Sequence, residues 1–236
     1  MIQFYAPDIA TNPVLPEGES HHCVKVLRTQ PGETVEVIDG KGFSYTCRLL
    51  DAHPKHALLE VVERREHPLP WGYHITIAVA PTKHLDRMEW LVEKLTEVGV
   101  NRFIPLKCDR SERKEIKTER LEKIAVSAMK QSLKATLPQI DTMTPIRKVI
   151  EQCHAPQRFI CYCDDAVERR LLAKELQPNA DVCVLIGPEG DFSPQEVQLA
   201  LDHGFIPVTL GDNRLRTETA ALFADSTIQT INQLSS

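Results

Sequence analysis

The stretch VCVLIGPEGDFSPQEVQLALDHGFIPVTLGDNRLRTETAAL, residues 182–222, decides the fold of this chain. Two short apolar runs, residues 182–186 and 206–210, have the length and composition of buried strands. Each run is followed by a glycine-containing loop and then by a segment that carries helix-start signals. Strands and helices that alternate in this way predict an α/β domain with a largely parallel sheet.

The same alternation extends upstream towards the amino terminus. The segments predicted as strands are residues 75–80, 103–106 and 159–163. Four apolar side chains at helical spacing precede Gly99, which can end a helix; they are Met88, Leu91, Leu95 and Val98. Thr118 can cap a second helix. Later helices are expected to begin near Ala166, Pro194 and Glu218.

The amino-terminal residues 1–70 show a different pattern, in which short alternating or β-branched segments are separated by turn sequences. The segments predicted as strands are residues 35–38, 45–50 and 57–62. Pro31-Gly32 and Asp39-Gly40 are turn dipeptides, so a small β-barrel or sandwich is predicted. Two prolines in residues 67–70 disfavour helix and suit a linker. We therefore expect one domain at 1–70 and a second at 71–236.

The composition is that of an ordinary globular protein, with 42% hydrophobic and 26% charged residues in 236. No apolar run approaches the roughly 20 residues that a membrane span requires. The amino terminus carries no recognisable secretory signal, so a cytoplasmic location without a membrane partner is expected. The net charge of −5 disfavours a nucleic-acid partner overall but is compatible with a local basic patch.

The cysteines are scattered along the chain and include no C-x-x-C pair, so reduced thiols and no metal site are expected. The seven residues are Cys23, Cys47, Cys108, Cys153, Cys161, Cys163 and Cys183. Cys161 and Cys163 alternate in a predicted strand and would point the same way, which is a weak metal signal without visible partner ligands.

The first loop of the opening stretch follows residue 186 and reads Gly187-Pro-Glu-Gly190. In a parallel α/β sheet, ligands bind outside the carboxyl ends of the strands, so this loop is a candidate site. The glycines allow a ligand to approach the backbone, while Pro188 fixes the turn. Residues 193–196 form a capping box with proline at the first helical position. The alternative is an ordinary connection between strand and helix.

The second loop begins at Gly211 and places Arg214 and Arg216 just before a helix. Thr217 or Thr219 could cap that helix, and an acidic residue at position 218 would complement its dipole. A well-capped helix with two solvated arginines is the alternative interpretation. Neither a G-x-G-x-x-G fingerprint nor a P-loop is present, which disfavours enzymes that cradle nucleotide phosphates.

Together the two loops resemble the late motifs of the SPOUT methyltransferases, and specifically of the family that methylates a uridine N3 in small-subunit ribosomal RNA. Segments resembling the same family's other motifs are residues 22–28, Lys83, Met88-Glu89, Lys94, residues 96–99 and residues 110–113. The chain departs from the family pattern at Asp191, where relatives carry a glycine, at Lys130 and at Lys134.

The resemblance implies an α/β, SPOUT-type, trefoil-knotted methyltransferase domain with a small amino-terminal PUA-like β-barrel that binds RNA. It implies S-adenosyl-L-methionine as the cofactor and N3 of a specific uridine in 16S ribosomal RNA as the target, uracil 1498 in the usual rRNA numbering. It also implies a homodimer formed through the knot domain and a substrate within the small ribosomal subunit.

The resemblance also implies the site residues. The cofactor-binding residues would be Leu185, Ile186, Gly187, Pro188, Gly190, Leu210, Gly211, Leu215, Arg216 and Thr217. An arginine over the uracil carbonyls would stabilise developing negative charge, and Arg216 is the first choice for this role. Glu189 and Glu218 are the carboxylates available to accept a proton, and each could instead fix a loop by accepting backbone hydrogen bonds.

Candidate RNA contacts are basic residues of both predicted domains: His22, Lys25, Arg28, Arg110, Arg113, Lys114 and Lys134. Residues 110–123 also interleave glutamates with the basic residues, so a solvated charged helix is the alternative there. Two other functions remain open. One is a related knotted enzyme that acts on tRNA or on a ribose hydroxyl, and the other is a non-catalytic RNA-binding assembly factor.

Overall fold

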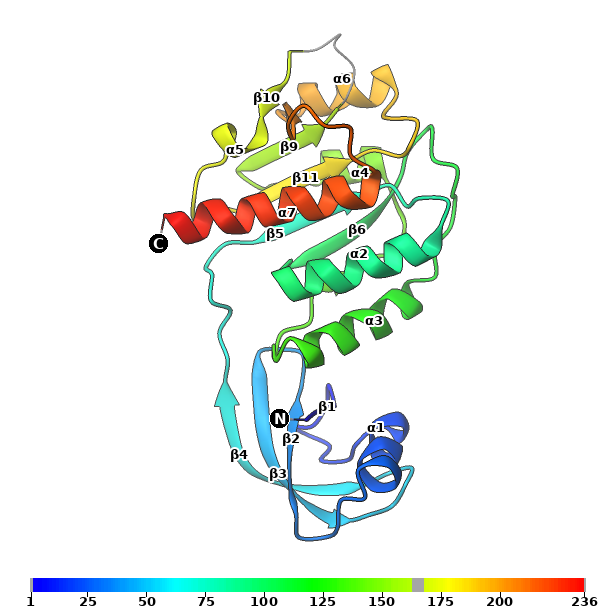
Figure 1. The fold of residues 1–236 in the computed structure, drawn as a ribbon, viewed down its shortest axis with the longest axis vertical. Helices are drawn as coiled ribbons and strands as arrows, with labels where there is room; N and C mark the ends of the chain where they lie inside the picture. The colour runs from blue at the N-terminus through cyan, green and yellow to red at the C-terminus, as the bar shows by residue number, and fades with distance from the viewer. Residues whose placement is uncertain (1, 163–167, 236) are drawn as a thin grey trace. The chain divides into compact units, whose positions relative to one another are not determined.

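The computed structural model describes residues 2–162 and 168–235 of the chain (Figure 1). The chain divides into two compact units, the first made of Met1–Pro70 with Val126–Leu137 and the second of Trp71–Ala125 with Pro138–Ser236. Helix α3 (Thr118–Gln131) contributes residues to both units. The end of the strand predicted at 159–163 and the start of the helix predicted near Ala166 lie outside the described residues.

The first unit is built on a four-stranded sheet whose order follows the sequence. Its strands are β1 (Gln3–Tyr5), β2 (Thr34–Ile38), β3 (Phe43–Asp51) and β4 (Leu58–Glu66). β1 lies parallel to β2, whereas β2, β3 and β4 pair antiparallel. The three predicted strands of this region are confirmed. β1 was not predicted, because three residues are too few to show a pattern.

A helical segment closes the apolar side of this sheet. It consists of α1 (Glu17–His21), which continues directly into the π-helix η1 (His22–Val26). Cys23 of η1 is fully buried in a cluster with Phe4, Val37 and Cys47 from the sheet. Residues 22–26 of the segment that resembles an RNA methyltransferase motif thus form a short π-helix. This geometry is rare and is often found at functional sites.

The second unit contains a parallel sheet, as predicted. Its strand order is β10-β12-β9-β11-β5-β6-β7, with β8 also paired to β6. The strands are β5 (Ile75–Val79), β6 (Arg102–Lys107), β7 (Gln139–Ile140), β8 (Thr144–Pro145), β9 (Gln157–Cys161), β10 (Arg170–Leu171), β11 (Val182–Ile186) and β12 (Ile206–Thr209). Every pairing in this sheet is parallel. β11 lies between β9 and β5 and is buried throughout.

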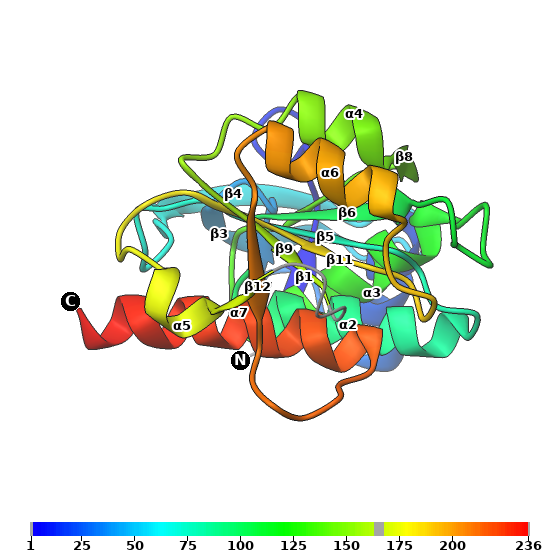
Figure 2. The ribbon, with the colours of Figure 1, turned by 90° about the horizontal axis from the view of Figure 1, so that it is seen from above.

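Helices cover both faces of this sheet, which explains why its central strands are apolar on both sides. Figure 2 shows α2 and α7 on one face and α4 and α6 on the other. The helices of the second unit, apart from α3, are α2 (Leu85–Val98), α4 (Ile146–Glu151), α5 (Leu172–Glu175), α6 (Pro194–Asp202) and α7 (Thr217–Leu234). No helix in the described ranges is long and apolar enough to cross a membrane.

Helix α2 ends at Gly99, as predicted, and this glycine has a φ of +127°. Val98 has the predicted helical spacing from Leu91 and Leu95, but its side chain is 37% exposed. Successive residues of an α-helix are about 100° apart, so Val98 lies at one margin of the apolar stripe. The buried face extends instead towards Val92 and Thr96, which are each 2% exposed.

Candidate active site

The loop of residues 187–192 connects β11 to α6 at the carboxyl end of the sheet. Asp191 has a φ of +60°, and its carboxylate accepts a hydrogen bond from the N–H of Phe192 at 2.8 Å. Aspartate tolerates this left-handed conformation better than most residues, and the glycine that the family pattern predicted here is not required for it. A Cβ at Gly187 would lie 3.2 Å from the buried Phe192 ring. A side chain at position 187 would therefore require the Phe192 ring to shift by a few tenths of an ångström.

The start of α6 anchors this loop. The predicted capping box is confirmed: Ser193 Oγ accepts a hydrogen bond from Glu196 N, and Glu196 Oε2 accepts one from Ser193 N at 2.8 Å. Glu196 Oε1 also accepts from the N–H of Asp109 at 2.8 Å, and Ser193 Oγ donates to Asp109 Oδ2 at 2.7 Å. The end of the loop after β11 is thereby fixed to the segment that follows β6.

Two arginines of the segment after β6 hold the neighbouring loops. Arg110 Nη1 donates to the carbonyl of Gly190 at 3.0 Å. Arg113 donates to the carbonyls of Thr82 and Lys83, at 3.3 and 2.7 Å, in the loop that follows β5. Both arginines were predicted to contact RNA, and that role stays a prediction. The structure gives them a second role, which is to position the loops at the carboxyl end of the sheet.

The loop before α7 leaves its backbone open to solvent. Thr209 Oγ1 accepts from Gly211 N at 3.3 Å and donates to Gly211 O at 2.9 Å, so a turn forms directly after β12. Gly211 has a φ of +124°, a conformation that L side chains rarely adopt. A Cβ there would meet no protein atom within 4 Å. Space for a ligand therefore exists beside the backbone of this glycine.

Helix α7 begins at Thr217, and its N-cap residue is Arg216, whose carbonyl accepts from Ala220 N at 2.7 Å. The prediction that Thr217 or Thr219 caps this helix was wrong, because no side chain caps it. Thr217 lies inside the first turn, and its Oγ1 donates instead to the carbonyl of Gly187 at 3.2 Å. This hydrogen bond joins the two glycine-containing loops, which are adjacent in space although β12 and α6 separate them in sequence.

Glu218 brings a carboxylate into the same region. The residue is only 7% exposed, and its Oε1 lies 3.6 Å from Arg87 Nη1 on α2. Its Oε2 is buried and has no hydrogen-bond partner among the described residues. A buried carboxylate oxygen without a partner is costly, and a bound substrate that donates a hydrogen bond to it would remove this cost. The sequence did not point to Arg87, because the contact depends on how α2 packs beside α7.

The remaining predicted catalytic residues differ in what they contact. Glu189 is exposed, and its Oε1 accepts from the N–H of Lys83 at 3.3 Å, so it fixes the loop after β5. Arg214 and Arg216 are also exposed. In the described part of the chain, neither arginine side chain has a hydrogen-bond or ion-pair partner. Arg216 is therefore free to reach a ligand bound beside the loop that it ends.

The other predicted cofactor-binding residues line the same loops. Leu185 and Ile186 are buried at the end of β11, and Pro188 is buried in the loop after it. Gly190 is exposed at the tip of that loop, while Leu210 and Leu215 are half-buried in the loop before α7. The structure thus brings the whole predicted cofactor-binding set to one edge of the sheet.

The predicted RNA contacts fall into two groups. His22 and Lys25 lie on η1, Arg28 follows it with a φ of +58°, and Lys134 follows α3, all in the first unit. Lys114 is exposed in the second unit, near the two arginines that hold the loops. Residues 112–117 are not helical, so the alternative of a solvated charged helix applies only from the start of α3 onwards.

Comparisons with known proteins agree with this architecture. The RNA methyltransferase domain family matches residues 69–229, and the RNA methyltransferase PUA domain family matches residues 15–62. Ribosomal RNA small subunit methyltransferase E of Synechocystis is 32% identical, over 89% of this chain and 70% of the relative.

Two solved structures extend the similarity to the whole fold. A probable rRNA-methyltransferase from Porphyromonas gingivalis is 45% identical, with a TM-score of 0.94 and full coverage of both chains. A ribosomal RNA small subunit methyltransferase E from Neisseria gonorrhoeae, bound to S-adenosyl methionine, is 29% identical, with a TM-score of 0.82 over 98% of this chain and 97% of that one.

These matches confirm the predicted fold class, an α/β domain of the SPOUT type with an amino-terminal PUA-like domain. They also confirm the resemblance that the two glycine-containing loops suggested. The chain belongs to the RNA methyltransferase family that includes the ribosomal RNA small subunit methyltransferases E.

Proposed function

We propose that this protein transfers a methyl group from S-adenosylmethionine to N3 of a uridine in the 16S RNA of the small ribosomal subunit. The observation that carries the proposal is the hydrogen bond from Thr217 to the Gly187 carbonyl. It brings together the two glycine-containing loops and places Arg216 and Glu218 beside them. The names of the relatives support a small-subunit ribosomal RNA as the substrate.

The residues at this edge fit S-adenosylmethionine. Open space beside Gly211 and the backbone groups of residues 187–190 would hold the adenine and ribose by close approach. Leu185, Leu210 and Leu215 would supply apolar contact. When bound, the cofactor supplies a methyl group on a sulfonium, which already has an excellent leaving group.

The chain's own side chains then have two tasks at the uracil. As the N3–H bond breaks and the N3–CH3 bond forms, negative charge develops on the uracil carbonyls, and the Arg216 guanidinium stabilises it. The N3 proton passes to the Glu218 carboxylate, whose Oε2 is the buried oxygen without a described partner. Glu189 is assigned to positioning, because it accepts a backbone hydrogen bond. Much of the rate comes from holding uracil and methyl donor in line.

The function is tested by incubating the protein with methyl-labelled S-adenosylmethionine and small subunits or 16S rRNA from cells that lack it. We expect 3-methyluridine at one position after digestion to nucleosides. A 2′-O-methylated nucleoside, or methylation of tRNA in place of rRNA, would instead identify a related enzyme. Absence of both methyl transfer and calorimetric cofactor binding would indicate an assembly factor without catalytic activity.

The basic residues at η1 are proposed to bind the RNA backbone. Lys25 and Arg28 are exposed, so replacing both by alanine should not disturb the core. We expect weaker RNA binding and a salt dependence whose slope falls by about two, because each lost phosphate contact lowers the slope by about one. Filter binding across a salt series measures both quantities.

The matched control, Arg48→Ala, removes an exposed arginine that pairs with Glu60 and should leave the slope unchanged. If the salt dependence of RNA binding is unchanged in the double variant, Lys25 and Arg28 do not contact the RNA backbone.

The protein is further proposed to form a homodimer through its second unit. The outer sides of α2 and α7 expose large apolar side chains, including Trp90 at 42% and Phe223 at 48%. We expect Phe223→Asp to raise the dimer dissociation constant by at least about 30-fold, since loss of an interface hot spot costs about 2 kcal/mol. Sedimentation velocity measures this constant.

The control variant is Val62→Asp, at a similarly exposed apolar position on β4, which should not change the dimer dissociation constant. If Phe223→Asp and Val62→Asp have the same dimer dissociation constant, α7 does not form the interface.

A further inference from the structure

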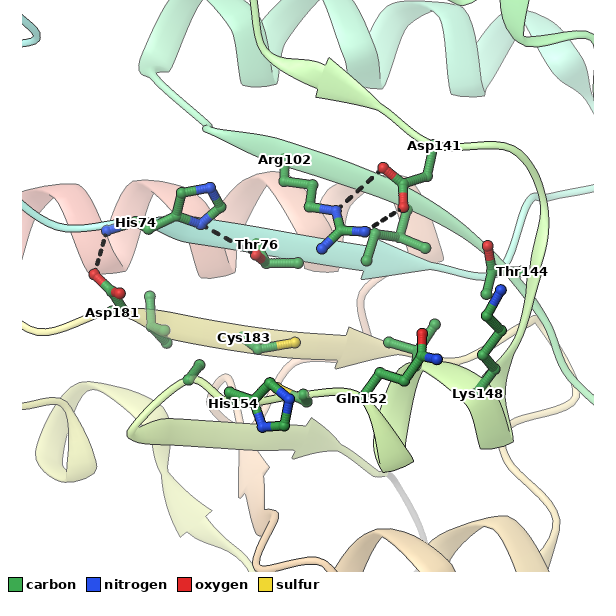
Figure 3. A pocket seen from close by; sticks show the side chains of 15 residues that line it. His74, Thr76, Arg102, Asp141, Thr144, Lys148, Gln152, His154, Asp181 and Cys183 are labelled. Atoms are coloured by element: carbon green, nitrogen blue, oxygen red, sulfur yellow. Dashed lines mark hydrogen bonds and ion pairs between the residues drawn. The ribbon is translucent and has the colours of Figure 1, made fainter.

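A cavity lies at the end of the parallel strands that is opposite to the two glycine-containing loops. It has a volume of about 410 Å³ and is shown in Figure 3. His74 directly precedes β5, Arg102 begins β6 and Asp181 directly precedes β11, so the cavity lies at the amino ends of these strands. None of the residues assigned to the methyl-transfer site lines it. Two cysteines do, Cys153 and Cys183.

The two cysteines line the same cavity and differ in their access to solvent. Cys183 is the second residue of β11; it is 2% exposed, and its side chain points into the cavity (Figure 3). Cys153 follows α4, is half-buried and packs against the apolar cluster that contains Cys183. One of the two thiols is therefore partly exposed, and the other is buried in the wall of the same cavity.

The surroundings favour a thiolate at Cys153. The Cys183 side chain, as a hydrogen-bond donor, lowers the pKa of Cys153. The N–H of Ala155 and the charges of Arg158 and His154 lower it as well, whereas burial raises it. The same hydrogen bond and burial raise the pKa of Cys183, which stays a thiol. The other titratable groups of the cavity wall are His74, Arg102, Asp141, Lys148 and Asp181. Arg102 is paired with Asp141.

Other cysteines lack this combination. Burial raises the pKa of Cys47 to about 12 and also raises the pKa of Cys108. Both thiols are buried in apolar clusters, so they remain protonated and inaccessible. Cys23 is fully buried as well, and burial raises its pKa. Cys153 differs from these three cysteines because it is partly exposed and has the Arg158 and His154 side chains nearby.

We propose that Cys153 and Cys183 form a reversible dithiol–disulfide pair that reacts with hydroperoxides. The Cys153 thiolate attacks the peroxide oxygen, the O–O bond breaks, and with one proton the products are a sulfenic acid on Cys153 and water or an alcohol. The Cys183 thiol then attacks the Cys153 sulfur, an S–S bond forms, and the sulfenic hydroxyl leaves with the thiol proton as water. The pair loses two electrons and the peroxide gains them. A dithiol reductant reverses the change.

Peptide mapping of the full-length protein tests this pair directly. Trypsin separates the two cysteines, since residues 149–158 contain only Cys153 and residues 175–214 contain only Cys183. After brief treatment with hydrogen peroxide, we expect these two peptides to be joined by a disulfide that dithiothreitol removes. Before treatment, iodoacetamide at neutral pH should alkylate Cys153 at least about 10-fold faster than Cys47, because the thiolate is the reactive form and burial raises the pKa of Cys47.

Variants separate the attacking from the resolving sulfur. Cys153→Ser should abolish the cross-link, whereas Cys183→Ala should stop the reaction at a sulfenic acid on Cys153 that dimedone traps. The matched control Cys161→Ser should still form the cross-link. Wild-type protein that yields no joined 149–158 and 175–214 peptides, or dimedone labelling that falls on another cysteine, would overturn the proposal. The wild-type mapping decides the matter even if Cys183→Ala does not fold.

Discussion

Arg216→Ala is expected to slow methyl transfer in a single turnover by about 100-fold or more, because the variant loses a donor aimed at charge that develops only in the transition state. Cofactor affinity and melting temperature should stay close to wild type. The structure supports this separation, since the Arg216 side chain is exposed and makes no hydrogen bond or ion pair with a described residue. As the N-cap of α7, Arg216 accepts the hydrogen bond from Ala220 N with its backbone carbonyl, which alanine retains.

Two companion variants sharpen this prediction. Arg216→Lys should recover only part of the rate, because a point charge replaces a planar fork that can meet a carbonyl edge. Arg214→Ala removes an equally exposed arginine from the same loop and should retain most of the activity. If Arg216→Ala keeps near-normal turnover, the catalytic charge comes from another residue. A joint fall in melting temperature and cofactor affinity would show that Arg216 only supports the loop.

The elements predicted from the sequence are those whose own residues carry the signal. β11 was predicted with the observed bounds, because its five apolar residues are buried on both faces. The start of α6 was predicted because Ser193 and Glu196 form a local capping box. Gly99 marked the end of α2, since a positive φ favours glycine. In each case the determining interaction lies within a few residues of sequence.

Elements that depend on distant partners could not be predicted in this way. β7, β8 and β10 have two residues each, and they exist as strands only because β6 and β12 pair with them. Helix α4 has six residues, too few for a periodic pattern. The order of the strands, with β11 between β9 and β5, also follows from packing that no single segment encodes.

In the candidate site, too, features with a local sequence signal were predicted and contacts with distant residues were not. The two glycine-containing loops were identified from sequence, because glycine, proline and arginine at a strand end are local signals. What those residues contact was not predictable. Thr217 was predicted as a possible cap and instead donates to the carbonyl of Gly187, while Arg113, predicted as an RNA contact, donates to the carbonyl of Lys83. The Arg87 side chain near Glu218 was missed, since it comes from a different helix.

Gly211→Val is expected to weaken S-adenosylmethionine binding by about 100-fold or more, which corresponds to about 2.8 kcal/mol. A β-branched side chain would fill the space beside Gly211 that no protein atom occupies within 4 Å, and the cofactor could not approach the backbone. Isothermal titration calorimetry measures the affinity. Gly187→Val is a less clean test, because its Cβ would lie 3.2 Å from the Phe192 ring and disturb the packing of the loop itself.

The matched control for this variant is Gly32→Val in the first unit. Gly32 has a φ of +94° and, like Gly211, has no atom within 4 Å of an added Cβ. Both variants therefore carry a similar backbone strain of about 1–3 kcal/mol, which lowers the melting temperature by roughly 2–4 °C per kcal/mol. The loss of cofactor affinity should appear only in Gly211→Val, because only that glycine lies beside the proposed cofactor. Equal affinity in the two variants would remove the loop before α7 from the cofactor site, and with it the reason for placing Arg216 at the uracil.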